Sequence, residues 1–206
     1  DAIRAAVEKH NRLCRVITGI GDLRKLPDPP ITGYEFHVIQ LVSQVCPHDL
    51  ILPYLEETLE ELRTRMPEAK FPFRARVVLA GSEIDDPAFT KLLEMCGAMV
   101  VADRYCFGSF PSREEIGIRP GETAFDAVCR HYLHTNQCAR FMSGDKIDQR
   151  HRELERLVRE FHADGIIYES MKFCEFWSYE KVLASHVLQQ EMGIPCCTIE
   201  KEYTLG

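Results

Sequence analysis

The sequence predicts an α/β fold, with a doubly wound, mostly parallel sheet of four or slightly more strands and an N-terminal helical layer. Short apolar runs rich in β-branched residues recur in the second part of the chain, and each is followed by glycine or a polar residue. Amphipathic helical segments separate these runs, and strands that alternate with helices form parallel sheets. With 206 residues, 45% of them hydrophobic, the chain can bury a full core.

The first part of the chain is predicted to be helical. Its elements are, in order, a helix to about Ile17, a proline-rich connection over residues 26–32, and helices over residues 35–46 and 50–66. The last helix places Leu55, Leu59 and Leu62 on one face, as expected of an amphipathic helix. We therefore divide the chain into a helical segment, residues 1–70, and an α/β domain, residues 71–206.

Strands and helices alternate along the predicted α/β domain. The strands cover residues 75–80, 98–102, 165–168 and 196–199. The helices cover residues 87–95, 123–132, 146–161 and 178–191. Because crossovers between parallel strands are right-handed, all four strands point the same way, as in flavodoxin-like and Rossmann-like sheets. Their carboxyl ends then share one edge, where such folds bind ligands.

The composition argues against several classes of protein. A net charge of -7 and a pI near 5.6 provide no basic face for nucleic acid. The sequence contains no apolar run long enough for a membrane span and no signal peptide. We therefore expect a cytoplasmic protein with neither nucleic acid nor membrane as a partner. The chain begins with Asp1 rather than Met, so we expect it to be part of a longer polypeptide.

Nine cysteines without a signal peptide indicate reduced thiols or metal ligands rather than a disulfide framework. The sequence contains no Cys-x-x-Cys pair, which excludes zinc ribbons, thioredoxin-like redox sites and the compact ferredoxin pattern. Any cluster must use ligands that are far apart in the sequence.

Two cysteines fall in the loops that leave the predicted strands at the ligand-binding edge. The four loops cover residues 81–85, 103–108, 169–174 and 200–203. Cys106 and Cys174 lie in the second and third loops and are a candidate metal-ligating pair. On spacing alone, the ordinary alternative is that both thiols are buried and inert. Arg104 and Lys172 would favour thiolates, or a reduced cluster, by placing positive charge nearby.

The other cysteines are predicted to be mainly structural. Six lie in helices, at a helix end or at the opening of a strand and are expected to be small buried hydrophobes: Cys14, Cys46, Cys96, Cys129, Cys196 and Cys197. Cys138 is a third candidate ligand, because the long insertion after Cys106 can fold back over the same edge. Replacing Cys196 or Cys197 is expected to lower stability and to leave metal content unchanged.

Other motifs are incomplete. Gly19-Ile-Gly21 lacks the third glycine of the dinucleotide fingerprint and follows a helical segment, so it predicts a helix terminus or a turn. No Walker A sequence and no His-Glu-x-x-His arrangement is present. His131 and His134 are expected to form a pair on a helix surface rather than a zinc site.

The cysteine loops resemble those of a known family. Residues 163–177, Ala-Asp-Gly-Ile-Ile-Tyr-Glu-Ser-Met-Lys-Phe-Cys-Glu-Phe-Trp, resemble the third cysteine motif of benzoyl-CoA reductase and 2-hydroxyacyl-CoA dehydratase subunits. Residues 101–108, Val-Ala-Asp-Arg-Tyr-Cys-Phe-Gly, resemble the second motif, and residues 29–35 resemble the segment that joins the two domains of these subunits. The chain is thus identified as the C-terminal domain of such a subunit, and residues 1–70 are expected to lead from a preceding N-terminal domain.

The resemblance implies that Cys106 and Cys174 ligate a [4Fe–4S] cluster, with a further cysteine supplied by the N-terminal domain and one iron left open. An open iron can hold water or face the acyl-CoA substrate. The implied chemistry is one-electron reduction of a CoA thioester, with a homologous partner subunit and a separate ATP-hydrolysing activator that donates the electron. Tyr105, Glu169 and Glu175 flank the cysteines and are candidates for proton transfer.

Residues 171–179 and 199–206 are more similar to benzoyl-CoA reductase subunits than to the dehydratases. We therefore expect a subunit fragment of an aromatic acyl-CoA reductase, with an (R)-2-hydroxyacyl-CoA dehydratase subunit as the alternative. A non-catalytic flavodoxin-like domain that binds a small ligand, and a zinc or redox-thiol protein, stay open as other classes. The fragment alone is expected to fold without a stable cluster and without activity.

Overall fold

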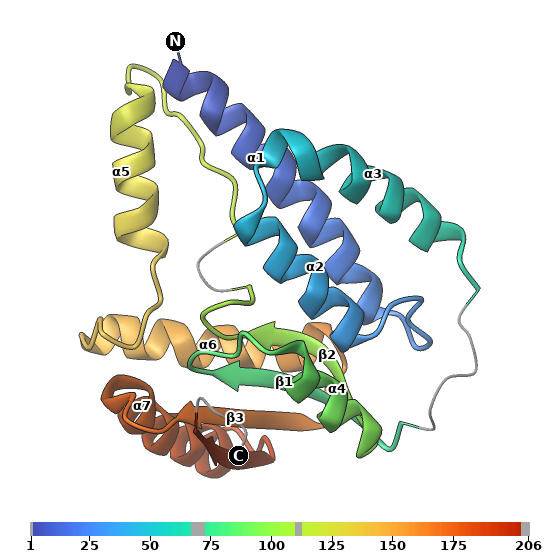
Figure 1. The fold of residues 1–206 in the computed structure, drawn as a ribbon. Coiled ribbons are helices and arrows are strands. Elements are labelled where there is room, and N and C mark those ends of the chain that lie inside the picture. Colours follow the sequence, from blue (N-terminus) through green and yellow to red (C-terminus); the bar gives the residue numbers. More distant parts are fainter. Residues whose placement is uncertain (1, 67–72, 110–112, 203–206) are drawn as a thin grey trace.

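A computed structural model describes residues 2–66, 73–109 and 113–202, and it contains a four-stranded sheet in which every pair of neighbouring strands is parallel (Figure 1). The strands are β1 (Ala75–Gly81), β2 (Ala98–Arg104), β3 (Gly165–Met171) and β4 (Cys196–Lys201). Their order across the sheet is β2-β1-β3-β4. The predicted α/β class and strand number are therefore confirmed.

Helices cover both faces of the sheet, which makes it doubly wound. α6 (Gly144–Glu160), α7 (Glu175–His186) and the short π-helix η2 (Val187–Glu191) pack on one face, and α4 (Pro87–Met95) packs on the other. On the first face Leu154 and Leu157 of α6 meet Val78 and Ile166 of the central strands. Val78 is fully buried, as expected for a strand covered on both sides.

The remaining helices form the layer predicted at the N-terminal end, and Figure 1 shows it lying beside the sheet. They are α1 (Ala2–Asp22), the 3-10 turn η1 (Leu23–Lys25), α2 (Gly33–Val45) and α3 (His48–Thr64). α5 (Ala124–Thr135) packs against the start of α1. α1 is longer than predicted and ends at Asp22, so Gly19 and Gly21 lie in its last turns. A Cβ on Gly21 would lie 2.9 Å from the Phe36 ring, so this glycine serves close helix packing.

The start of α2 is tied to the α/β part by a carboxylate from α4. The buried Glu94 accepts hydrogen bonds from the backbone N–H of Gly33 at 2.8 Å and of Tyr34 at 3.1 Å. Helix N-termini leave such donors without intrahelical partners, and a carboxylate there also complements the helix dipole. Burial raises the pKa of Glu94, and the three backbone N–H bonds it accepts oppose that rise. Thr32 and Glu35 complete the N-terminus with a capping box.

A second tie is centred on Asp103, near the end of β2, which is only 4% exposed. Its carboxylate accepts hydrogen bonds from Arg24 Nη2 at 3.1 Å, Gln40 Nε2 at 2.9 Å and the Ser109 backbone N–H at 2.6 Å. Burial alone would raise the pKa of Asp103, but the charges of Arg24 and Arg113 and these hydrogen bonds lower it overall. The sheet is thus joined to η1 and α2 through an ionised, buried side chain.

Replacing Arg24 with Met keeps an unbranched apolar stem and removes the charge that pairs with Asp103. Because the partner then stays buried and uncompensated, we expect the free energy of unfolding at pH 7 to fall by about 3–5 kcal/mol. Urea unfolding followed by far-UV circular dichroism measures this change.

Lys9→Ala is the matched control, because Lys9 and Asp49 pair at 2.8 Å on an exposed surface and such pairs contribute about 1 kcal/mol or less. Equal losses in the two variants would contradict the role given to Asp103. The folded-state pKa of Asp103 is lowered, so its contribution is present above the unfolded value of about 4 and is lost as the pH falls through the folded value. The stability gap between wild type and Arg24→Met should therefore narrow below about pH 4.

Candidate functional site

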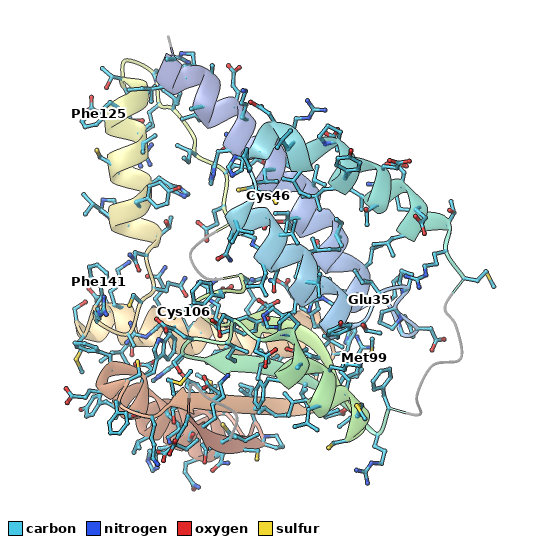
Figure 2. The ribbon with its side chains drawn as sticks, in the orientation of Figure 1. Glu35, Cys46, Met99, Cys106, Phe125 and Phe141 are labelled. Carbon is cyan, nitrogen blue, oxygen red and sulfur yellow. The ribbon has the colours of Figure 1, made fainter. Side chains whose placement is uncertain are left out.

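The carboxyl ends of the strands lie in register and form one edge. Ala80 of β1 pairs with Arg104 of β2, and Met171 of β3 pairs with Lys201 of β4. Cys106 follows β2 and Cys174 follows β3, so the two predicted ligands share this edge, with β1 between their strands. Figure 2 shows Cys106 at the ends of the green strands β1 and β2. Its backbone N–H donates to the Ser82 carbonyl at 3.0 Å, which fixes the loop after β2 against the loop after β1.

Cys106 is partly buried on the face of the sheet covered by α6 and α7. Burial raises the pKa of its thiol to about 12, and a hydrogen bond from Trp177 opposes that rise. Negative charge on Cys138 or Cys174 would raise it further, because both sulfurs lie close enough to act on Cys106. Cys174 is partly buried and occupies the N-cap position of α7. Cys106 and Cys174 thus pack against the same buried cluster at the carboxyl edge of the sheet.

Cys138 is brought to this region by the loop between α5 and α6. Arg150 of α6 donates to the Cys138 carbonyl at 3.4 Å and to the Phe141 carbonyl at 2.9 Å. The same guanidinium pairs with Glu180 of α7 at 2.6 Å, and both side chains are at least 95% buried. Arg150 thus ties the Cys138 loop to α6 and α7, and the role of Cys138 as a third ligand stays a prediction.

These thiols fit part of an iron–sulfur ligand set. Cysteine sulfur is the soft donor that such clusters use, and a bound metal deprotonates a thiol whose pKa is otherwise raised. Within residues 2–66, 73–109 and 113–202, no three or more His, Cys, Asp and Glu side chains converge as a site that could hold a metal ion. The assignment of Cys106 and Cys174 as ligands of one cluster therefore stays a prediction.

The three candidates for proton transfer lie in different places. Tyr105 is buried on the α4 face of the sheet, where its hydroxyl donates to Gln40 Oε1 at 3.2 Å, so it points away from the face that Cys106 contacts. Glu169 is fully buried in β3, and Glu175 is exposed in the first turn of α7. Glu175 directly follows Cys174 in the chain. The proton-transfer roles of all three residues stay predictions.

Glu169 is the most unusual of these carboxyls. One oxygen accepts from the Ser82 backbone N–H at 3.1 Å and from its hydroxyl at 2.8 Å, while the other oxygen is buried without a hydrogen bond. Burial raises the pKa of Glu169, and the bonds from Ser82 and the charge of Lys201 oppose the rise.

Several residues differ from their predicted settings. Cys96, Cys129 and Cys197 are exposed, so the expectation that they are buried was wrong. Cys196 pairs with Ile166 at the start of β3, which confirms that it lies far from the ligand loops, but β4 is an edge strand and not a buried one. A stability cost is therefore expected for replacing Cys196 and not for Cys197. His131 is buried, against the predicted surface pair.

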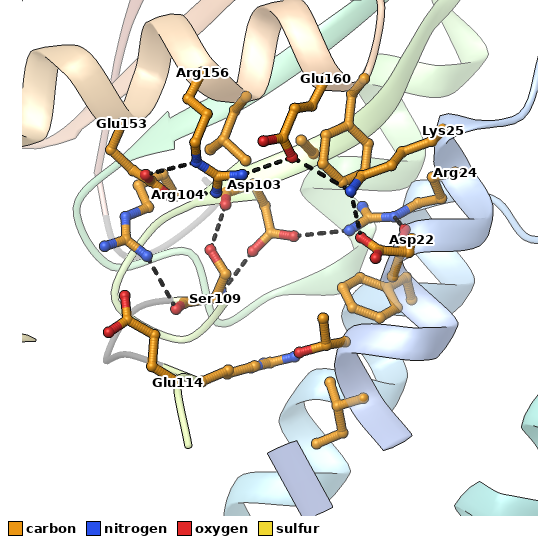
Figure 3. Close-up of a pocket in the computed structure, with 18 residues that line it drawn as sticks. Asp22, Arg24, Lys25, Asp103, Arg104, Ser109, Glu114, Glu153, Arg156 and Glu160 are labelled. Atoms are coloured by element: carbon orange, nitrogen blue, oxygen red, sulfur yellow. Dashed lines mark hydrogen bonds and ion pairs between the residues drawn. The ribbon is translucent and has the colours of Figure 1, made fainter. Parts of the chain in front are cut away.

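A cavity of about 360 Å³ lies beside the end of β2, between the sheet, α6 and the end of α1 (Figure 3). Its walls carry charges of both signs that pair with each other, as in the bonds of Arg156 to Glu153 at 2.7 Å and to Glu160 at 2.6 Å. Lys25 pairs in the same way with Asp22 and Glu160. The lining includes none of the cysteines, so this cavity is separate from the cysteine edge.

Comparisons with known proteins identify the family of the chain. The family model for the 2-hydroxyglutaryl-CoA dehydratase D-component matches residues 1–205. The chain belongs to this family. The family's members include 2-hydroxyacyl-CoA dehydratase and benzoyl-CoA reductase subunits, so the predicted membership is confirmed.

Two curated relatives match at low identity. YjiM of Escherichia coli K12, which carries the name of a dehydratase subunit, is 24% identical over 208 residues, covering 99% of this chain and 53% of that protein. A benzoyl-CoA reductase subunit of Thauera aromatica is 22% identical over 184 residues, covering 85% of this chain and 45% of that protein. The chain thus spans about half the length of these relatives. Among the helices described, none has the length and apolarity needed to cross a membrane.

Phe173, next to Cys174, was not singled out by the sequence. It is 93% exposed and has a φ of 70°, a left-handed conformation that costs a bulky residue about 1–2 kcal/mol. Phe176 and Tyr179 are also exposed on the outer side of α7. The loop that carries Cys174 therefore holds an aromatic ring in solvent at an energetic cost.

Replacing Phe173 with Gly should raise the free energy of unfolding by roughly 1 kcal/mol, because glycine adopts positive φ freely and the exposed ring contributes little packing. Thermal unfolding of the chain measures the change. Phe176→Gly is the control: it lies inside the first turn of α7, where glycine lowers stability by about 1 kcal/mol. A loss of stability in both variants would contradict strain at Phe173.

Proposed function

We propose that this chain is part of an iron–sulfur enzyme subunit that acts on an acyl-CoA thioester by one-electron chemistry. The observation that carries the proposal is the position of Cys106 and Cys174 at the same carboxyl edge of a parallel sheet, in a chain that belongs to the dehydratase family. Because each cysteine follows a strand of one sheet, the two thiols could reach one [4Fe–4S] cluster only from the same edge. The remaining protein ligand would come from another part of the complete protein.

The bound cluster would supply a low-potential electron or a Lewis-acidic iron to the thioester group. The residues of this chain have more definite tasks. Cys106 and Cys174 would hold the cluster from two loops, and Trp177 and the apolar face of α7 would exclude water from the Cys106 side. The Arg150–Glu180 pair would keep the Cys138 loop closed over the same edge.

Two proton carriers fit this arrangement. Glu175 is exposed beside Cys174 and can exchange protons with a bound substrate or with solvent. Glu169 is buried at the same edge with a raised pKa, so it can hold a proton that the reaction needs later. Tyr105 is bound to Gln40 on the other face, and its contribution would be to the shape of the Cys106 loop.

The proposed reaction is reduction of an aromatic acyl-CoA, on the basis of the residues around Cys174 and the similarity to the benzoyl-CoA reductase relative from Thauera aromatica. Dehydration of a 2-hydroxyacyl-CoA is the second candidate. It is favoured by a dehydratase family model that matches residues 1–205 and by a relative with a dehydratase name that covers 99% of the chain. Either reaction would need a homologous partner subunit and an ATP-hydrolysing electron donor.

The ligand assignment predicts iron loss in defined variants of the complete protein. Cys106→Ala and Cys174→Ala should lower bound iron and sulfide by about tenfold or more after anaerobic purification, since even outer-shell changes cost metal sites about 10–100-fold in affinity. Cys197→Ala is the control, because this thiol is exposed at the opposite end of the sheet. Full iron content in both ligand variants, or absence of iron from the wild type, would refute the assignment.

The two reactions predict different products. The complete protein, its partner subunit and the ATP-driven donor should convert benzoyl-CoA to a ring-reduced thioester, and removal of ATP should stop turnover. Conversion of 2-hydroxyglutaryl-CoA to its unsaturated product, with no reaction of benzoyl-CoA, would replace the first candidate with the second. Anaerobic incubation followed by mass spectrometry of the thioesters distinguishes the outcomes. Turnover by protein that contains neither iron nor sulfide would exclude both.

A further inference from the structure

Ser82 is the first residue after β1, and it is completely buried. The preceding Gly81 has a φ of 145°, a conformation that favours glycine. A Cβ on Gly81 would lie 2.0 Å from the carbonyl oxygen of Glu169, so no larger residue fits against β3 at this point. The glycine therefore allows the chain to bring Ser82 directly against β3, where it forms its hydrogen bonds.

The hydroxyl of Ser82 supplies a hydrogen-bond partner to the end of β3. The pairing of β1 with β3 ends at Gly81 and Glu169, but β3 continues to Met171. Buried backbone donors need a partner, and the Met171 N–H donates to Ser82 Oγ at 2.6 Å. A hydroxyl can accept and donate at the same time, and that of Ser82 donates to Glu169 Oε2 at 2.8 Å. The carboxylate thus leaves the oxygen of Ser82 free to accept from β3.

The same residue is hydrogen-bonded to both of the loops that carry the candidate ligands. On one side, its carbonyl accepts the backbone N–H of Cys106 at 3.0 Å. On the other side its hydroxyl holds Met171, whose carbonyl accepts the backbone N–H of Cys174 at 3.0 Å. A continuous series of hydrogen bonds therefore leads from the backbone of Cys106 to that of Cys174, and it passes through Ser82 and Met171.

We propose that Ser82 is a positioning residue that sets the spacing between the loops of Cys106 and Cys174 by bonding to both. Its carbonyl fixes the loop after β2, and its hydroxyl fixes the end of β3. The two loops thus keep one separation, although β1 lies between their strands. The value of this spacing for ligation rests on the proposed function, and Ser82 itself transfers neither electron nor proton.

Ser82→Ala removes the hydroxyl and keeps the backbone carbonyl. In the complete protein, freed of metal with a chelator, the exchange of the Met171 and Cys174 amides with D2O should become about tenfold faster relative to Val78 and Leu79 in β1. That factor is what the loss of one hydrogen bond contributes to a local opening equilibrium. Mass spectrometry with residue-level fragmentation measures the rates. A uniform increase along both strands, as a general loss of stability would cause, would overturn the proposal.

Ser170→Ala is the matched control, because Ser170 is equally buried in β3 but its hydroxyl accepts from Lys181 Nζ at 2.8 Å. It should leave the relative exchange rates at their wild-type values. Ser82→Thr retains the hydroxyl and should return the rates toward those of wild type. Equal effects of the two alanine variants would contradict the proposal. If Ser82→Ala does not fold, Ser82→Cys replaces it, since a thiol has a similar size and bonds more weakly.

Iron release from the complete protein provides a second measurement. After anaerobic purification, Ser82→Ala should lose iron to an added chelator about tenfold faster than wild type, since changes just outside a ligand set weaken metal sites by about 10–100-fold. Ser170→Ala should lose iron at the wild-type rate, and equal rates in the two variants would overturn the role of Ser82 in ligation. A wild type without iron would instead refute the proposed function. The exchange rates of the metal-free protein still test Ser82 in that case, so the two failures are distinguishable.

Discussion

The cysteine edge depends on the buried carboxylate of Asp103. This side chain sits just before the loop that carries Cys106, and it accepts the Ser109 backbone N–H at the other end of that loop. The turn closes so tightly that a Cβ on Gly108 would lie 2.4 Å from an Asp103 oxygen and 2.6 Å from the Tyr105 ring. The loop is therefore wrapped around one charge. Arg24 and Gln40 hold the same charge from the helical layer, so the layer and the loop share an anchor.

A second constraint is the burial of Cys106, which would oppose the ligation that we propose for it. The packing of α6 and α7 against the sheet places this thiol in surroundings that disfavour its anion. Cys106 packs, with Cys174, against the buried cluster that contains Trp177. Such a site stays protonated and unreactive until a cation with affinity for sulfur arrives. In the proposed enzyme, burial would then protect the ligated sulfur from solvent.

The sequence predicted much of this arrangement for identifiable reasons. The four strands are apolar β-branched runs followed by glycine or polar residues, and the loops after them were placed on one edge by the parallel topology alone. The order of the strands could not be predicted, because no local pattern in the sequence indicates that β4 is an edge strand. For this reason the predictions that Cys197 is buried and that β4 is a buried strand were wrong. Boundaries also shifted, as at α1, which continues through Gly19 and Gly21.

The contacts between side chains at the site could not be predicted from the sequence. The alternation of faces places Tyr105 with Gln40 and Cys106 with Trp177, although the two residues are adjacent in the chain. A tryptophan three residues after a cysteine at a helix start is a usable signal, because this spacing turns the side chain back toward the loop. The Arg150–Glu180 pair carries no such signal. Its residues lie on different helices, and only the packing of those helices brings the charges together.

The strand order also sets a sequence of events during synthesis. β1 and β2 are synthesised early. β3 pairs with β1 at the centre of the sheet, but the whole α5–α6 insertion lies between them in the chain. Arg76 and Asp164, which hydrogen-bond beside this strand pair, are 88 residues apart. Such long-range pairing forms late in folding. Until then Cys106 is held only by its own loop and Asp103, because neither Trp177 nor the rest of α7 has packed against the sheet. The Cys106 thiol is thus exposed to solvent while the ribosome completes the chain, and it becomes partly buried only when α7 packs against the sheet.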